Sequence, residues 1–397
     1  MMSVWSSLVG QDAAVAKLSE AAASARAIVA SRGSGRATDE ARSMSHAWLI
    51  TGPPGSGRSV AARAFAAALQ CTGATPGCGQ CPGCRTTMGR TNADVLFAAT
   101  ETSIINVETA RSLVLQAQSS PSQGLWRVIV VEDADRLGES GANALLKAIE
   151  EPPEHTVWLL CAPSPEDMIA TIRSRCRHLG LRIPTATAVA DLLVREGIAT
   201  PEVALEAARA AQSHIGLACA LARDPQMRER RRNIITAPAS VRSVGEAVMA
   251  ADRLLETAKA QADAQVSDRN AREKADLLRQ LGMEESENAT KASRTMLRQL
   301  EEDQKRRSKR ALTDAIDRAL IDLLAIYRDV LMVQVGGDGE LINTDLSELV
   351  HQIAHDSTPH QTLARVDHIE TARKRLVANG NPLLVLEDMA ISLRPQA

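Results

Sequence analysis

The segment from Gly52 to Ser59 limits what this chain can fold into more than any other part of its sequence. It follows the phosphate-binding pattern G-x-x-x-x-G-K-[ST] at every position but one, where Arg58 replaces the lysine. The pattern works because its glycines let backbone N–H groups turn toward phosphate oxygens, while the hydroxyl holds magnesium. The residues that we assign to nucleotide binding here are Gly52, Pro53, Pro54, Gly55, Ser56, Gly57, Arg58 and Ser59.

The flanks of this segment favour a phosphate-binding loop. Trp48 to Ile50 is a short apolar run typical of a strand, and Val60 to Leu69 is rich in helix formers. Strand, glycine-rich turn and helix are the context that the motif requires, so we predict this order here. The alternative is a Gly/Pro turn that matches the pattern by chance.

A second apolar run, Arg127 to Val131, ends in the acids Glu132 and Asp133. In P-loop ATPases such a strand end supplies a magnesium-associated acid and often a second carboxylate that activates water. The usual order is Asp then Glu. Here the order is reversed, and the carboxylate in the water-activating place is one methylene shorter. We assign both acids to the nucleotide site; the alternative is a strand end with solvated acids.

Four cysteines lie close together in the sequence, with the spacing C-x6-C-x2-C-x2-C and several glycines between them. Four thiolates on a glycine-rich turn suit a closed, tetrahedral zinc site, and disulfides are disfavoured in a reducing compartment. With no open coordination position the Zn2+ is expected to be structural. Unliganded thiols and an iron–sulfur cluster are the alternatives. The four residues are Cys71, Cys78, Cys81 and Cys84.

Composition limits the function classes. The chain has 397 residues, is 45% hydrophobic and carries a formal net charge of −2, as expected for a globular protein of two or three domains. No apolar run is long enough to span a bilayer, and the start lacks the pattern of a signal peptide, so we expect a cytoplasmic protein without membrane partners. Near-neutral charge disfavours a dedicated, free-standing DNA-binding protein.

Two further segments carry specific patterns. Asn143 to Pro153 has one apolar helix face and ends at paired prolines, and a strand follows at Val157 to Cys161. The triplet Ser174-Arg175-Cys176 comes next. An exposed arginine after a core strand can serve a phosphate in a neighbouring subunit as an arginine finger.

Together with Val9-Gly10-Gln11, these segments resemble the delta-prime subunits of bacterial DNA polymerase III clamp loaders, which are AAA+ family proteins. The resemblance covers residues 1 to about 185. It implies an α/β AAA+ P-loop domain, with a parallel sheet and flanking helices, followed by a small helical lid and an all-helical C-terminal domain. The implied domains are 1–183 with a zinc module at 71–84, 184–240 as the lid, and 241–397 as an oligomerising collar with a charged extension at 263–310.

The resemblance also implies partners and a role. Clamp loaders are hetero-pentamers of tau/gamma motor subunits, delta and delta-prime, which load a sliding clamp onto primer–template DNA in the replisome at the nucleoid. In that family the arginine of the S-R-C triplet points into the ATP site of an adjacent subunit, which here assigns the catalytic role in trans to Arg175. The chain is then part of the DNA polymerase III holoenzyme without polymerase activity of its own.

The sequence departs from the active motor pattern in four places. Besides Arg58 and the reversed acids, Ala162-Pro163 stands where active relatives carry threonines, and Cys219 stands where they carry a sensing arginine. Together these changes indicate a stator-like subunit that is deficient in hydrolysis, while binding of ATP or ADP with Mg2+ remains open.

The remaining segments give weaker patterns. Residues 31–45 are predicted to be a surface insertion, and the charged stretch 263–310 a solvated helical hairpin. Lys305 to Arg310 is a basic cluster, for which a DNA-phosphate role competes with a solvated helix face. An apolar stripe at steps of three and four, from Leu312 to Val330, belongs either to the collar interface or to a core within the domain.

Two other functions stay open at this point. One is a catalytically active tau/gamma-type clamp-loader ATPase, which the four departures disfavour. The other is a free-standing zinc-containing DNA-binding protein, which predicts tight, salt-dependent DNA binding by the monomer.

Overall fold

A computed structural model describes residues 3–31, 43–98, 105–281 and 291–394. The chain forms two compact units, Met1–Cys219 and Ala220–Ala397. The division at residues 183 and 240 stays a prediction. Most of the predicted surface insertion, at 32–42, lies outside the described residues.

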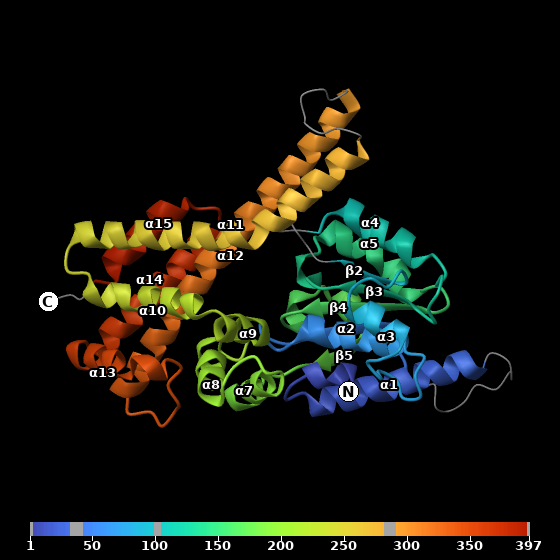
Figure 1. The fold of residues 1–397 in the computed structure, drawn as a ribbon, viewed down its shortest axis with the longest axis horizontal. Helices are drawn as coiled ribbons and strands as arrows, with labels where there is room; N and C mark the ends of the chain where they lie inside the picture. Colours follow the sequence, from blue (N-terminus) through green and yellow to red (C-terminus); the bar gives the residue numbers. More distant parts are fainter. Residues whose placement is uncertain (1–2, 32–42, 99–104, 282–290, 395–397) are drawn as a thin grey trace. The chain divides into compact units, whose positions relative to one another are not determined.

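A parallel five-stranded sheet organises the first unit (Figure 1). Its order is β2-β3-β4-β1-β5, so that β1 lies between β4 and β5 although it precedes both in the chain. Because all strands run the same way, their carboxyl ends meet at one edge, where ligands of open α/β sheets bind. The strands are β1 (Ala47–Thr51), β2 (Val95–Ala98), β3 (Arg127–Val131), β4 (Thr156–Ala162) and β5 (Arg177–Gly180).

Helices cover both faces of this sheet, and side-chain alternation along the strands explains why. In β1, Trp48 and Ile50 pack into the core shared with α1 and α2, whereas Ala47 and Leu49 pack into the core shared with α4 and α5. Strands buried on both faces read as continuous apolar runs, which is the pattern seen in the sequence. The helices are α1 (Asp12–Ser31), α2 (Arg58–Leu69), α3 (Pro82–Met88), α4 (Val107–Ala117), α5 (Glu139–Glu150) and α6 (Ala170–Arg173).

Three more helices follow β5: α7 (Ala186–Arg195), α8 (Pro201–Ala210) and α9 (Ile215–Arg223). Short 3-10 turns add η1 (Val4–Ser7), η3 (Ala134–Arg136) and η4 (Pro165–Asp167). The first unit therefore has the predicted parallel sheet with flanking helices, and this part of the fold prediction is confirmed.

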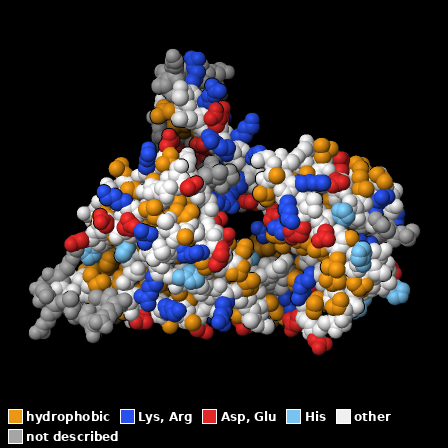
Figure 2. All heavy atoms as spheres, turned by 180° about the vertical axis from the view of Figure 1, so that it is seen from behind, with side chains coloured by type: hydrophobic (Ala, Val, Ile, Leu, Met, Phe, Trp, Pro, Cys, Tyr) orange, Lys and Arg blue, Asp and Glu red, His pale blue; other side chains and the backbone are white. Residues whose placement is uncertain are grey.

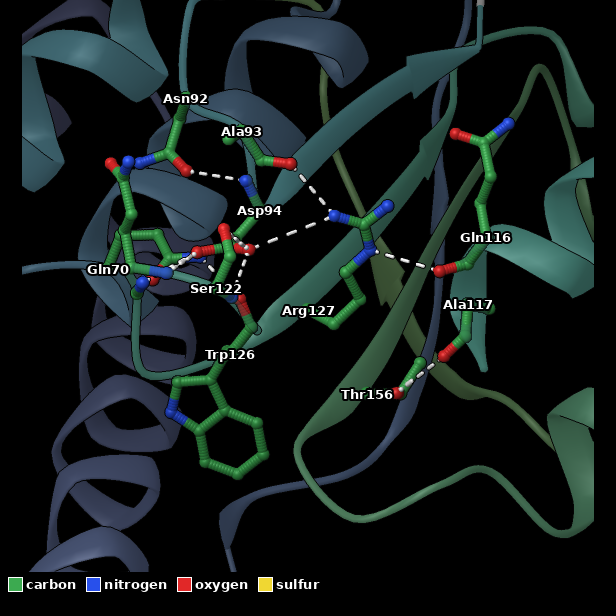
Figure 3. Close-up of polar contacts among 12 residues, drawn as sticks. Gln70, Asn92, Ala93, Asp94, Gln116, Ala117, Ser122, Trp126, Arg127 and Thr156 are labelled. Atoms are coloured by element: carbon green, nitrogen blue, oxygen red, sulfur yellow. Dashed lines mark hydrogen bonds and ion pairs between the residues drawn. The ribbon is translucent and has the colours of Figure 1, made fainter. Parts of the chain in front are cut away.

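A buried carboxylate fixes the loop that leads into β3 (Figure 3). Asp94 accepts hydrogen bonds from the N–H groups of Ser122 (2.6 Å), Gln123 (2.7 Å) and Gly124 (2.6 Å), and its side chain is 1% exposed. Gln70, at the end of the P-loop helix, accepts from the N–H of Leu125 at 3.0 Å. These contacts tie α2 and the start of β2 to one loop, because they supply hydrogen-bond partners to the buried side chains of Asp94 and Gln70.

The second unit is helical. Its elements are α10 (Pro225–Ser240), α11 (Val244–Gln280), α12 (Lys291–Gln334), η6 (Thr344–Leu346), α13 (Ser347–Asp356), α14 (Pro359–Val377) and α15 (Pro382–Ser392). The apolar stripe of α12 is mostly buried inside this unit: Ile316, Leu320, Leu323, Tyr327 and Val330 all belong to its core. In this structure the stripe therefore serves a core within the unit.

The charged stretch lies on a hairpin of α11 and α12, as predicted (Figure 1). Arg307 of α12 forms an ion pair with Glu273 of α11 at 2.8 Å, which links the two helices. Arg306 forms a second ion pair with Asp303 at 3.3 Å, within α12. Figure 2 shows Lys and Arg side chains interspersed with Asp and Glu side chains along this projection. This mixed pattern favours a solvated face for the basic cluster over a dedicated phosphate-binding strip. Within the described ranges, no helix has the length and apolar character needed to cross a membrane.

Candidate nucleotide site and arginine finger

The P-loop runs from the end of β1 into the start of α2, as the motif requires. Gly55 and Gly57 both have φ of 89°, a conformation that glycine adopts without strain. A Cβ added at Gly52 would lie 2.5 Å from Ser56 Oγ, and that buried hydroxyl has no hydrogen-bond partner among the described residues. The loop thus keeps a glycine-lined turn with an unsatisfied polar group, which fits an anion cradle.

Gln11 fastens this loop to two distant segments. Its Nε2 donates to the carbonyl oxygens of Ser56 (3.3 Å) and Arg182 (2.5 Å), and its Oε1 accepts from the N–H of Arg182 (3.2 Å). Gln11 is 5% exposed. The Val-Gly-Gln segment noted in the sequence therefore has a structural role beside the P-loop, which its residue types alone did not reveal.

Arg58 does not extend away from the loop as the motif's lysine is expected to do. Its Nη1 donates to the carbonyl oxygen of Gly52, the first residue of the motif, at 2.7 Å. A planar guanidinium satisfies such a carbonyl with a directed hydrogen bond, which a flexible ammonium holds less rigidly. The positive charge is kept at the loop, but one of its donors is already used within it.

Glu132, at the end of β3, is also engaged. Its Oε1 lies 2.5 Å from Nη2 of Arg90, and the carboxylate is 12% exposed. Arg90 follows α3 with a φ of 59°, and its guanidinium lies 4.9 Å from the centre of the Phe97 ring. A carboxylate held by a neighbouring guanidinium is less free to bind magnesium or to activate water.

The acids after β3 interact electrostatically with Arg58, and the assignment of Asp133 to a nucleotide site stays a prediction. Burial raises the pKa of Asp135, with a further contribution from Asp133, and the charge of Arg58 opposes this rise. Burial likewise raises the pKa of Cys161 to about 12, and Glu132 adds to it. The structure therefore brings Arg58 and the acids of the β3 end into one electrostatic neighbourhood at the carboxyl edge of the sheet.

The positions expected to sense phosphate carry no such groups. At the end of β4, Ala162 is fully buried, and the carbonyl of Pro163 accepts a hydrogen bond from the N–H of Gly52 at 3.1 Å. Cys219 lies in α9. His214 was not singled out in the sequence, yet a Cβ added at Gly55 would lie 3.1 Å from its Cα. Only the close packing at Gly55 reveals this neighbour.

The four clustered cysteines converge, as their spacing predicts. The Sγ atoms of Cys71, Cys78, Cys81 and Cys84 all lie within 4.8 Å of one another. Four sulfur ligands at this separation suit tetrahedral coordination with metal–sulfur bonds of about 2.3 Å. The cluster is thus a candidate metal centre, on the segment that joins α2 to β2.

Backbone hydrogen bonds favour the thiolate form of two of these sulfurs, those of Cys78 and Cys81, whereas burial raises the pKa of Cys84. Burial opposes ionisation of Cys81, but the N–H groups of Cys84 and Thr72 outweigh it and lower the pKa of Cys81 to about 6. The N–H groups of Gln80 and Cys81 lower the pKa of Cys78. Since the thiolate is the form that binds metal, this arrangement favours a bound cation.

Arg175 lies on the surface just after α6. Its Nε pairs with Oε1 of Glu150 at the end of α5, and its Nη1 donates to the carbonyl of Thr171 at 2.7 Å. The side chains of Arg175 and Glu150 are 38% and 41% exposed. Arg175 is thus exposed and paired with Glu150, a contact that sequence reasoning missed, and its role as an arginine finger stays a prediction.

A family model described as "DNA polymerase III, delta subunit" matches residues 36–185, the segment that contains the P-loop, the cysteine cluster and Arg175. Over this region, the chain is similar to subunits of DNA polymerase III. Its curated relatives include a delta' subunit from Pseudomonas aeruginosa, 32% identical over 48% of this chain, and a gamma/tau subunit from Mycobacterium bovis, 35% identical over 39% of this chain.

The matches cover only part of these clamp-loader relatives, 59% of the delta' subunit and 28% of the gamma/tau subunit. Both kinds of subunit are thus similar to the same region, and the likeness alone does not separate them. A solved gamma subunit-related protein from Thermotoga maritima aligns with 87% of this chain and 93% of its own, at 16% identity and a TM-score of 0.43. So weak a likeness carries no inference about activity.

Proposed function

We propose that this chain is the delta-prime type of clamp-loader subunit, a stator that assembles with tau/gamma motor subunits and delta and assists in loading a sliding clamp onto primed DNA. The observation that carries the proposal is the contrast between its two arginine sites. Arg58 donates to its own loop, whereas Arg175 is exposed and oriented by Glu150.

In this proposal Arg175 is the residue that takes part in chemistry, on the nucleotide of an adjacent subunit. An arginine finger stabilises the charge that develops on the transferred phosphoryl group, and it must arrive with its guanidinium already directed outward. The Glu150 carboxylate and the Thr171 carbonyl hold the guanidinium from one side. A neighbour's phosphate then replaces a surface ion pair, which stabilises little by itself.

The chain's own P-loop then serves mainly to bind. It keeps the glycine turn and the Ser59 hydroxyl, so ATP or ADP with Mg2+ is held by the loop backbone and by Arg58. Hydrolysis is deficient because Glu132 is engaged by Arg90 and because Ala162 and Pro163, at the end of β4, carry no hydroxyl. Zn2+ on the four cysteines stabilises the segment that carries Arg90.

The decisive experiment uses the reconstituted loader with the full-length chain carrying Arg175→Ala. DNA- and clamp-stimulated ATP turnover should fall by about tenfold, which is less than the thousandfold or more of a single-site enzyme because only one of several ATP sites is affected. Arg173→Ala is the matched control, since Arg173 is an exposed arginine at the end of α6, two residues before Arg175. Unchanged turnover with intact assembly would remove the role assigned to Arg175.

The gamma/tau relatives favour one competing function, an active motor subunit. The isolated chain distinguishes the two. A stator gives no magnesium-dependent ATP turnover above that of its Glu132→Ala variant. A motor subunit gives turnover that this variant abolishes.

A further inference from the structure

The second unit contains a cavity of about 340 Å³ between α10, α12, α13 and α14, which is within the usual size range of small-molecule sites. Part of its lining is apolar, including Pro238, Leu349, Ile353 and Leu393. Polar and charged side chains line the rest, among them Tyr327 of α12 and Arg365 of α14.

Arg365 occupies a position where an apolar residue is expected. The buried residues of α14 are Thr362, Arg365, Ile369 and Ala372, which recur at steps of three and four as in an apolar seam. Arg365 is 7% exposed, and its guanidinium makes no hydrogen bond or ion pair within the described part of the chain. Its guanidinium lies over the ring of Tyr327, whose centre is 5.8 Å away.

Another buried arginine of the same unit shows that such a charge is ordinarily paired here. Arg231 is 8% exposed, and it donates to Oδ1 of Asp322 at 2.9 Å and to Oδ1 of Asn343 at 2.6 Å. The nitrogens of Arg365 are not among the fully enclosed polar atoms, so water or an anion that enters the cavity can reach them, and a guanidinium pairs best with an anion. The difference between Arg231 and Arg365 therefore points to an anion that completes the second site.

The hydroxyl of Tyr327 also lacks a hydrogen-bond partner among the residues that the structure describes, and Tyr327 is 3% exposed. Burial raises the pKa of Tyr327 to about 12, so the group remains a neutral hydrogen-bond donor. A guanidinium and a phenol that line one cavity offer donors to the two oxygens of a carboxylate.

We propose that this cavity binds a small organic acid, whose single carboxylate pairs with Arg365 and accepts a hydrogen bond from Tyr327. The apolar part of the ligand lies against Pro238, Ile353 and Leu393. Arg242 and Asp356 also line the cavity, so its charged side chains together carry one positive charge, which matches a single carboxylate better than a dianionic phosphate. The site lies wholly in the second unit and is independent of the nucleotide site.

The chain offers a direct probe, because Tyr327 is its only tyrosine. Full-length protein labelled with 3-fluorotyrosine gives one fluorine NMR signal, which reports on this cavity. Titration with sodium hexanoate should shift the signal in a saturable way. Equal concentrations of 1-hexanol, which has the tail without the carboxylate, and of inorganic phosphate should not.

Arg365→Met keeps a long apolar side chain and removes the charge, and should weaken hexanoate binding by about tenfold or more, the effect of losing a charge-assisted hydrogen bond. Arg375→Gln is the control, since Arg375 lies on α14 in an exposed pair with Asp388 and should bind as the wild type does. Thermal melting establishes that both variants fold. A shift that does not saturate, an equal shift with hexanol or phosphate, or unchanged binding by a folded Arg365→Met protein would overturn the proposal.

Discussion

At the P-loop, the guanidinium of Arg58 donates to the carbonyl of its own loop, whereas after α6 the guanidinium of Arg175 lies at the surface beside Glu150. Both side chains belong to the same unit and carry the same charge. The two guanidinium groups differ in whether they remain free to bind an anion from another molecule. Arg58 completes an internal arrangement, and Arg175 can exchange one exposed carboxylate for another anion. The residue type alone does not distinguish an arginine that shapes a site from one that acts on a partner.

The largest effect is expected from removing the metal, because the cysteine cluster anchors the segment that leads to Arg90 and hence to Glu132. Cys84→Ala should abolish metal binding and destabilise the first unit by several kcal/mol, since structural zinc binding contributes on the order of 10 kcal/mol in small domains. Metal content and thermal melting are the measurements. Cys219→Ala, outside the cluster, should retain about one metal ion per chain.

The second-largest effect is expected from Asp94, whose carboxylate holds the loop that leads into β3. Burial opposes ionisation of Asp94, but the N–H groups of Ser122, Gln123 and Gly124 outweigh it and lower its pKa. Asp94→Asn should destabilise the protein by about 1–3 kcal/mol, through loss of charge-assisted hydrogen bonds. Denaturant unfolding of both proteins at neutral pH measures this difference.

The pH dependence of the same group has a definite sign. Because the folded pKa of Asp94 is lower than the unfolded value of about 3.9, the stabilisation is complete above that value. It is lost as pH falls through the lower, folded pKa. The gap in stability between the wild type and Asp94→Asn should therefore narrow below about pH 4, and a gap that stays constant through acid would argue against this carboxylate as its source.

A smaller effect is expected from restoring the lysine of the P-loop. Arg58→Lys should not produce ATP turnover in the isolated chain, because Glu132 remains paired with Arg90 and the acidic pair remains reversed. The measurement is magnesium-dependent phosphate release. If this single change restored ATP turnover, Arg58 alone would account for the missing hydrolysis. The contrast drawn between Arg58 and Arg175 would then be wrong.

The smallest effect is expected at Glu150. Its pair with Arg175 is exposed, so Glu150→Gln should change stability by less than about 1 kcal/mol. In the assembled loader we expect ATP turnover to fall by less than threefold, because Arg175 keeps its charge and loses only part of its orientation. A loss as large as that of Arg175→Ala would show that the pair, and not the arginine alone, is what a neighbour requires.

Local sequence patterns predicted the helices, the strands and the clustered cysteines well where the residues concerned lie close together in the sequence. The strand, turn and helix around Gly52 to Ser59 and the convergence of the four cysteines follow from spacing within one short segment. The pairs Arg90–Glu132 and Arg175–Glu150 join residues 42 and 25 positions apart. Nothing in periodicity or propensity links such residues, since the topology of the sheet brings them together.

The same reason explains what sequence reasoning missed in the second unit. The apolar stripe from Leu312 to Val330 is visible in the sequence, but Tyr327 fits that stripe as an apolar residue, and its hydroxyl gives no further signal. Arg365, in the seam of a different helix, was not noticed. An arginine at a core position of an amphipathic helix can indicate a binding site. For Arg365 this indication became specific only when the structure placed Tyr327 of α12 beside it.

The place of β1 in the sheet has a consequence for how the protein is made. Both of its neighbours, β4 and β5, are synthesised more than 100 residues later, and Gln11 has to wait for Arg182 before its hydrogen bonds can form. During translation the P-loop strand therefore emerges with both edges unpaired. Contacts this distant in sequence form slowly, and unpaired strand edges invite association with other chains. We expect the nascent chain to depend on a chaperone until residue 182 has left the ribosome, as a truncation series with a reporter of aggregation would reveal.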